Sequence, residues 1–210
     1  MSRVSKFISV AAIAFAAMSC GGSKENAAEK ANIDGVLAGA PSSEVVLSVL
    51  ELDQISVLDT LMTDEAGKFS YEVEVSEGDP EFVYVYADGR KVASLIVEAG
   101  DKVSVQTDTL GNSVVEGSEE SLKLASVEAD YAKAKAAMAA LSSQLLAADA
   151  DQAAALREKL SRTYVEYYRG RVAYVMKNNR SLTVVPVMYQ SLSESLPVFA
   201  QSTDAIIFSN

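Results

Sequence analysis

The side chains that most often carry enzyme chemistry are scarce in this sequence. Cys20 is the single cysteine among 210 residues, and the sequence contains no histidine. Histidine is the commonest general base and the commonest metal ligand in proteins. Catalysis would therefore have to rely on Asp, Glu, Lys, Tyr or Ser, and no set of these residues forms a recognisable catalytic, cofactor-binding or metal-binding motif. The sequence first raises the question of what Cys20 does.

The segment that precedes Cys20 has the layout of a secretory signal peptide. Residues 1–6 are basic, with Arg3 and Lys6, and residues 7–18 form an apolar run. A charged end, an apolar middle and a small residue at the cleavage site are typical of such signals. The apolar run is too short for a membrane-spanning helix, which needs about 20 residues. We therefore expect residues 1–19 to be a signal peptide.

The residues Ala17-Met18-Ser19-Cys20 resemble the lipobox of bacterial lipoproteins, with Ala17 where leucine is usual. The resemblance implies cleavage before Cys20 and acylation of its thiol, which would anchor the protein in a membrane at about 0.8 kcal/mol per buried CH₂. The alternative is an ordinary signal peptide beside an incidental cysteine. Lipidation would use the only thiol, so it would exclude disulfides, thiolate nucleophiles and cysteine-based zinc sites.

The charge of the chain argues against nucleic acid as a partner. The formal net charge is −11, and loss of residues 1–19 would remove two basic residues and no acidic one. Nucleic-acid binding requires a basic surface, and electrostatic binding to anionic lipids has the same requirement. An excess of acidic residues is typical of a surface that keeps a protein soluble. The expected partners are a membrane, reached through Cys20, and an unidentified envelope protein or ligand.

The middle of the chain predicts a β-sandwich. Residues 20–32 are small and polar and predict a flexible tether. From 33 to 117, apolar residues recur with a period of two, and turn residues such as Asp88-Gly89 separate the segments. About seven short strands at this spacing predict an antiparallel β-sandwich or an open barrel. The expected strands are 44–52, 54–62, 68–75, 81–88, 91–99, 102–107 and 113–117.

The composition changes after Gly117, and residues 118–210 predict a helical region. Apolar residues recur at spacings of three and four residues in 118–149 and again in 149–179. This spacing predicts two long helices that form an antiparallel hairpin. Residues 181–201 predict a short third helix, with Pro186 in its first turn. Asp204 resembles a helix start close to the end of the sequence, so we expect this region to be incomplete at its C-terminal end. The alternative is a short tail that packs on the helices. The predicted fold class is α+β.

Several turn and packing motifs in 33–121 resemble a known family. In order, they are Gly35, Asp59-Thr60, Gly67-Lys68-Phe69, Glu98-Ala99-Gly100-Asp101 and Gly117-Ser118. Their order is similar to that of the small β-sandwich of unknown function that precedes a thioredoxin-like domain in many bacterial envelope lipoproteins. In those relatives the thioredoxin-like domain carries Cys-x-x-Cys. This sequence has no such motif, so the resemblance implies the fold and does not extend to redox activity.

Three groups of residues could bind a ligand, and each has a plainer interpretation. The tyrosines of 164–174, with Arg162, Arg169 and Arg171, could bind an anion or a sugar, but aromatic residues at helical spacing usually pack against a neighbouring element. Tyr84 and Tyr86 could form a carbohydrate platform, although such residues more often cover a sheet face. The third group, Glu72, Glu74 and Glu77, could bind a divalent ion, but a solvated sheet face has the same pattern and the calcium-loop spacing is absent.

The sequence is compatible with three functions. The first is a non-catalytic binding or scaffolding module in the bacterial cell envelope, at the outer membrane and facing the periplasm or the cell surface. The second is the N-terminal part of a thiol–disulfide oxidoreductase whose Cys-x-x-Cys domain is missing from this chain. The third is a histidine-free hydrolase, which would need paired acids in a cleft that the sequence does not locate. We favour the first for these residues and the second as their family context.

Overall fold

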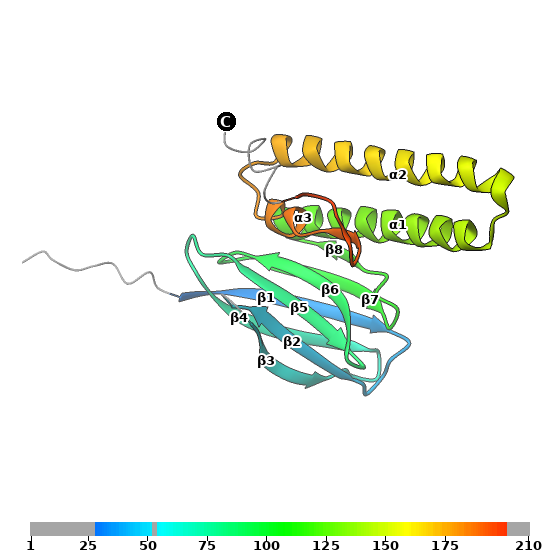
Figure 1. The fold of residues 1–210 in the computed structure, drawn as a ribbon. Helices are drawn as coiled ribbons and strands as arrows, with labels where there is room; N and C mark the ends of the chain where they lie inside the picture. The colour runs from blue at the N-terminus through cyan, green and yellow to red at the C-terminus, as the bar shows by residue number, and fades with distance from the viewer. Residues whose placement is uncertain (1–27, 52–53, 201–210) are drawn as a thin grey trace, which may run out of the picture.

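The computed structural model describes residues 28–51 and 54–200. Cys20, the expected signal peptide and residues 201–210 lie outside this part of the chain. Figure 1 shows a two-layer β-sandwich with two long helices stacked along one side of it. The sandwich strands are β1 (Ala28–Ala38), β2 (Glu44–Leu50), β3 (Ile55–Met62), β4 (Lys68–Ser76), β5 (Glu81–Ala87), β6 (Arg90–Val97), β7 (Lys102–Asp108) and β8 (Val114–Glu116). The elements that follow are α1 (Glu119–Ala147), α2 (Ala150–Lys177), α3 (Val184–Met188), β9 (Ser191–Ser193) and β10 (Leu196–Pro197).

The described strands of the sandwich form two sheets of four, in the orders β4-β1-β7-β8 and β3-β2-β5-β6. The predicted α+β class, the sandwich and the helical hairpin are confirmed. The hairpin between β5 and β6 turns at Asp88 and Gly89, and both residues have positive φ angles, 49° and 68°. Two consecutive positive φ angles define the tight turn that Asp-Gly favours.

The strand β1 was not among the seven expected strands. It begins at Ala28, within the segment 20–32 that was expected to be a tether, because residues 28–36 find a complete antiparallel partner in β4. It also pairs with β7 in parallel, so the sandwich is not purely antiparallel. A parallel pair needs a long crossover connection, and the strands β2 to β6 provide one here.

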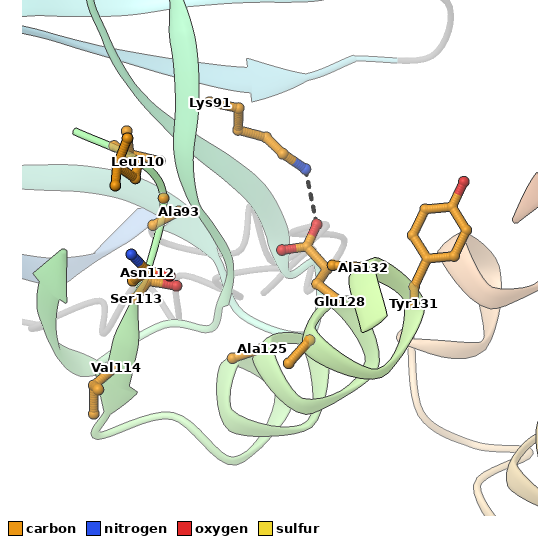
Figure 2. Close-up of a pocket in the computed structure, with 13 residues that line it drawn as sticks. Lys91, Ala93, Leu110, Asn112, Ser113, Val114, Ala125, Glu128, Tyr131 and Ala132 are labelled. Carbon is orange, nitrogen blue, oxygen red and sulfur yellow. Dashed lines mark hydrogen bonds and ion pairs between the residues drawn. The ribbon is translucent and has the colours of Figure 1, made fainter. Parts of the chain in front are cut away.

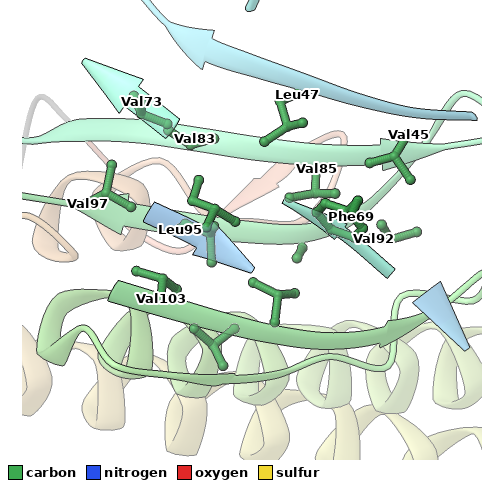
Figure 3. Packing of buried hydrophobic residues seen from close by; sticks show 14 of the residues in the cluster. Val45, Leu47, Phe69, Val73, Val83, Val85, Val92, Leu95, Val97 and Val103 are labelled. Atoms are coloured by element: carbon green, nitrogen blue, oxygen red, sulfur yellow. The ribbon is translucent and has the colours of Figure 1, made fainter. Parts of the chain in front are cut away.

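The core lies between the two sheets and consists mainly of valine and leucine. Figure 3 shows these side chains meeting from both layers. Val83 and Val85 of β5 and Leu95 of β6 are fully buried, as are Ile33 of β1 and Leu47 of β2. This is the pattern that alternating strands predict, because every second side chain points to the same face.

The two long helices form the predicted antiparallel hairpin, and a side chain caps the start of each. Ser118 accepts a hydrogen bond from the backbone of Ser121 at the start of α1. Asp149 accepts one from Gln152 at the start of α2. A side-chain oxygen at this position stabilises a helix by about 1 kcal/mol, because it pairs a backbone N–H that the helix leaves free.

The segment 181–201 is only partly helical. The helix α3 covers five residues, and the chain then forms the small hairpin of β9 and β10. The predicted short third helix is therefore confirmed, and the hairpin of β9 and β10 that follows it was not predicted. Val187, Leu192, Val198 and Phe199 are all buried in a second apolar cluster together with residues of α1 and α2. Packing against the two long helices has overridden the helical preference of a short segment.

Candidate functional site

The start of α1 is joined to the sandwich through two buried serines. The hydroxyl of Ser121 donates to the carbonyl of Ile96 at 2.7 Å and accepts from the N–H of the same residue at 2.9 Å. The hydroxyl of Ser118 donates to the Ile96 carbonyl as well, at 2.9 Å. Ile96 lies in β6, which is an edge strand. The two serines therefore satisfy backbone groups that a further strand would otherwise pair, and they fix the helix to this edge.

Next to this joint lies a groove of about 670 Å³ between α1, the start of β6 and the loop that connects β7 and β8. Figure 2 shows its two walls, with Leu110 and Val114 on one side and Ala125 and Ala132 on the other. Ala129 completes the helical wall. Small side chains at these positions keep α1 from filling the space, so the groove is a consequence of the helix sequence.

The polar end of the groove is formed by Lys91 and Glu128. The Lys91 Nζ lies 2.8 Å from Glu128 Oε1, and the Ser94 hydroxyl donates to the same oxygen at 2.8 Å. Lys91 also lies 5.2 Å from the centre of the Tyr84 ring. Burial, with the nearby Glu128 carboxylate as a second cause, raises the pKa of Tyr84. The Lys91 and Glu128 side chains are both partly exposed, so both can also reach a ligand in the groove.

The loop that forms the other wall is held by one carboxylate. Asp108 Oδ1 accepts hydrogen bonds from the backbones of Leu110 and Asn112 at 2.9 and 3.0 Å. The Asn112 amide donates to Asp108 Oδ2 at 2.7 Å, and these bonds hold the pKa of Asp108 below its usual value. Leu110 and Val114 stay exposed by 71 and 61%. The groove therefore has a preformed wall that presents apolar side chains to solvent.

The chemistry of this groove suits binding. It offers apolar contacts, a cation, a carboxylate and the polar side chains of Asn112 and Ser113. Both of these hydrogen bonds, from Lys91 and from Ser94, reach the same carboxylate oxygen, Glu128 Oε1. A ligand with an apolar body and a few polar groups would match these walls.

The tyrosines of α2 pack against the C-terminal segment. The Tyr167 hydroxyl donates to Gln190 Oε1 at 2.7 Å, and the Tyr174 hydroxyl lies 2.6 Å from Thr183 Oγ1. Tyr164 stacks on Tyr168 with ring centres 6.3 Å apart, and the Tyr164 hydroxyl reaches the carbonyl of residue 197. These are the contacts that the packing interpretation of the segment 164–174 expects.

The three arginines of this segment do not converge on one site. Arg162 pairs with Glu158 on the surface of α2 at 2.6 Å, and Arg169 is exposed. Arg171 is only 8% exposed and donates to Asp130 Oδ2 of α1 at 3.0 Å. Its guanidinium lies over the rings of two tyrosines, at 5.1 and 5.4 Å, in the cation–π geometry. Arg171 therefore joins the two long helices.

The other two candidate groups lie on sheet faces. Tyr84 and Tyr86 are half-buried on β5, opposite Ser48 and Val46 of β2, and do not form an open platform. Glu72 and Glu74 are exposed on β4, and Glu72 pairs with Lys30. Within residues 28–51 and 54–200, no group of three or more acidic residues is arranged to hold a metal ion.

The motif positions that resemble the known family have structural roles. A Cβ at Gly35 would collide with the ring of Phe69, and a Cβ at Gly117 would collide with the backbone carbonyl of Lys102. Gly117 has a φ angle of +93°, which also favours glycine. In the turn before β4, Asp64 Oδ1 accepts from the backbone of Lys68 at 2.8 Å. These residues specify the fold.

Cys20 lies outside the described residues, and its predicted lipidation stays a prediction. Among the described helices, none combines the length and the apolar character needed to cross a bilayer. The groove at the sandwich–helix junction was not predicted from the sequence. Two signals were available, namely the small residues at every third or fourth position of α1 and the turn residues 108–112.

Comparison with known proteins identifies the sandwich. Residues 31–124 match the family described as "Domain of unknown function (DUF4369)". The match runs from β1 into the first turns of α1, and it includes both serines that hold the helix to β6. No curated protein matches the chain. The chain therefore contains a DUF4369 domain, formed by residues 31–124.

Proposed function

We propose that the protein is a lipid-anchored component of the bacterial cell envelope that acts as a non-catalytic binding or scaffolding module. The observation that carries the binding role is the groove between α1 and the sandwich, with a preformed wall and exposed apolar side chains. The anchor is supported by the lipobox-like sequence that ends at Cys20. Lipidation there adds membrane affinity in proportion to the acyl CH₂ groups buried.

The position of the helical hairpin relative to the expected anchor fits this role. In Figure 1 the start of β1 lies at one end of the sandwich, and the turn between α1 and α2 projects beyond the other end. A chain anchored through a residue that precedes β1 would hold the helical hairpin away from the membrane. The groove along α1 would then be open to partners in the surrounding compartment.

The anchor is tested by labelling. Cells that express the full chain are grown with a palmitate analogue that can be detected after gel separation. We expect labelling and membrane fractionation of the parent chain, and loss of both in Cys20→Ala. Ser19→Ala keeps a small residue before the cysteine and is the matched control that should still be labelled. Labelling that survives in Cys20→Ala would refute the anchor.

The binding role is tested by photo-crosslinking in cells. A photoreactive amino acid replaces Ala129, which lines the groove, or Ala139, which is exposed elsewhere on α1. The proposal expects a discrete cross-linked product for position 129 and none for position 139. Products of equal yield at both positions would contradict a binding role for the groove.

A second function is favoured by the resemblance of the DUF4369 domain to domains that precede a thioredoxin-like fold. Under it, these residues are the N-terminal part of a thiol–disulfide oxidoreductase. This alternative predicts that the reading frame continues after Asn210 into a strand–helix unit with Cys-x-x-Cys. Sequencing of the gene beyond that codon distinguishes the two, since a stop codon there contradicts the alternative.

A further inference from the structure

One wall of the groove beside α1 ends in a strand that has a free side. β8 is last in the order β4-β1-β7-β8, and it pairs with β7 through Val114, Val115 and Glu116. No strand among residues 28–51 and 54–200 pairs with its other side. Val114, at the start of β8, lines the groove together with Asn112 and Ser113. The groove therefore borders a strand edge to which a further strand could be added.

The other strand that borders the groove, β6, already has partners along its outer side. The main-chain N–H and carbonyl of Ile96 are both bonded to the serines at the start of α1. Nearer the groove, the carbonyl of Val92 accepts a hydrogen bond from the hydroxyl of Thr107 at 3.0 Å. Side chains of the protein itself thus take the place of a neighbouring strand along β6. An incoming strand is therefore expected at β8.

The helical wall of the groove matches a short extended peptide in length. Ala125 and Ala132, both labelled in Figure 2, are about 10 Å apart along the helix at 1.5 Å per residue. That length equals about three residues of extended chain at 3.3 Å each. β8 also has three residues. The wall consists largely of Ala125, Ala129 and Ala132, whose small side chains let a main chain come close to the helix.

The polar groups of the groove suit the amides of a peptide. Both hydrogen bonds to Glu128 reach Oε1, so within the described part of the chain Oε2 is left as an acceptor. On the opposite wall, the Asn112 amide donates one N–H to Asp108, which leaves its second N–H and its carbonyl oxygen for a ligand. Each peptide unit carries one donor and one acceptor, so a peptide can use groups of both kinds.

The charges around the groove favour a basic peptide. Lys91 is the one cation among the residues that line the groove, and it is paired with Glu128. Glu116 lies two residues after Val114, so the two side chains point to the same face of β8. Glu116 is exposed and forms none of the ion pairs found in residues 28–51 and 54–200. A Lys or Arg beside the groove would therefore meet an unpaired carboxylate.

We infer that the groove binds an extended, basic segment of a partner polypeptide, which adds to β8 as a further strand and places side chains against the alanines of α1. This inference rests on the binding role proposed above and specifies its ligand. Main-chain hydrogen bonds supply affinity in this mode of binding, and contacts with alternate side chains supply specificity. The exposed Leu110 and Val114 provide apolar contacts on the strand side. Because β8 has only three residues, the bound segment is short.

Selection from a displayed library of random linear peptides tests this inference. The full chain is the target, and each enriched peptide is synthesised and its affinity measured by fluorescence polarisation. Ala129→Trp fills the groove, and Ala139→Trp is the matched control, because Ala139 is an exposed alanine of the same helix outside the groove. We expect peptides, richer in Lys and Arg than in Asp and Glu, that bind the parent chain and Ala139→Trp equally and bind Ala129→Trp roughly tenfold more weakly. Circular dichroism checks that both variants are folded.

Methylation of single N–H groups in these peptides distinguishes strand addition from other modes of binding. In an added strand, the N–H groups of alternate residues point towards the neighbouring strand. Methylation should therefore weaken binding roughly fivefold at every second residue of the bound segment and have little effect at the residues between.

Three results would overturn the inference. They are the absence of any enriched peptide that distinguishes Ala129→Trp from Ala139→Trp, a net negative charge on the peptides that do, and methylation effects without a period of two. The photo-crosslinking test is independent of all three. If position 129 gave a discrete product in cells while no such peptide was enriched, the binding role of the groove would stand and the peptide ligand would be wrong.

Discussion

Replacement of Ser121 by alanine tests how the helix is held to the sandwich. Ser121 is fully buried, and in the described residues its hydroxyl is the partner of the Ile96 N–H. The Ile96 carbonyl keeps a second partner in Ser118, so the lost group is the donor. A buried N–H without a partner costs about 1–3 kcal/mol. The higher helix propensity of alanine returns about 0.5 kcal/mol. We therefore expect the free energy of unfolding to fall by about 0.5–2.5 kcal/mol.

The assay is urea unfolding followed by circular dichroism, with thermal unfolding as a second measurement. A loss of this size corresponds to a decrease in Tm of roughly 1–10 °C for a protein of this length. Ser126→Ala is the matched control, because Ser126 is an exposed serine of the same helix and should gain only the propensity term. If Ser121→Ala were as stable as Ser126→Ala, the hydrogen bonds to Ile96 would not hold the joint.

Three further predictions concern the turn, the helix pair and pH. Gly117→Ala should lower the free energy of unfolding by roughly 2 kcal/mol or more, because its φ is positive and a Cβ meets a backbone carbonyl, whereas Gly89→Ala should cost about 1 kcal/mol. Urea unfolding compares them. Arg171→Ala should cost about 3 kcal/mol through lost packing and a lost ion pair, and Arg162→Ala less than about 0.5 kcal/mol, in the same assay. Burial raises the pKa of Tyr167 to about 12, above the value of about 10 in an unfolded chain. The folded state therefore holds this proton more tightly, so the stabilisation is complete below pH 10 and is lost as the pH rises through 12. Urea midpoints measured at pH 9 and pH 11.5 should show this loss, and Tyr167→Phe should show less of it.

Local sequence patterns predicted the elements of this fold well. The alternation of residues 68–75 and the Asp88-Gly89 turn act over a few residues, and both appear in the structure as expected. The helical hairpin also followed from apolar spacing within each helix. These features depend on the spacing of apolar and turn residues along the chain, which can be read directly from the sequence.

The features that were missed depend on contacts between distant parts of the chain. The parallel pairing of β1 with β7 joins segments about 70 residues apart and leaves no local signal. The start of β1 at Ala28 depends on β4 as a partner, since residues 28–32 have no strand pattern of their own. The hairpin after Met188 forms because Leu192 and Phe199 are buried against the long helices. The groove could not be predicted either, because its walls come from three separate elements, namely α1, β6 and the loop between β7 and β8.

The family match covers one wall of the groove and ends just before the other. The match ends at Leu124, so the residues of β6 and of the loop before β8 lie inside the DUF4369 domain. The helical wall, from Ala125 to Ala132, lies just outside it. A protein that shares this domain but differs after Leu124 would keep one wall of the groove and change the other. In the proposed binding role the helix would then select the ligand, while the domain and its two serines set where the helix lies. Exchange of residues 125–132 between two such proteins should therefore transfer the binding preference and leave the sandwich unchanged, and a preference that stayed with the domain would contradict this division.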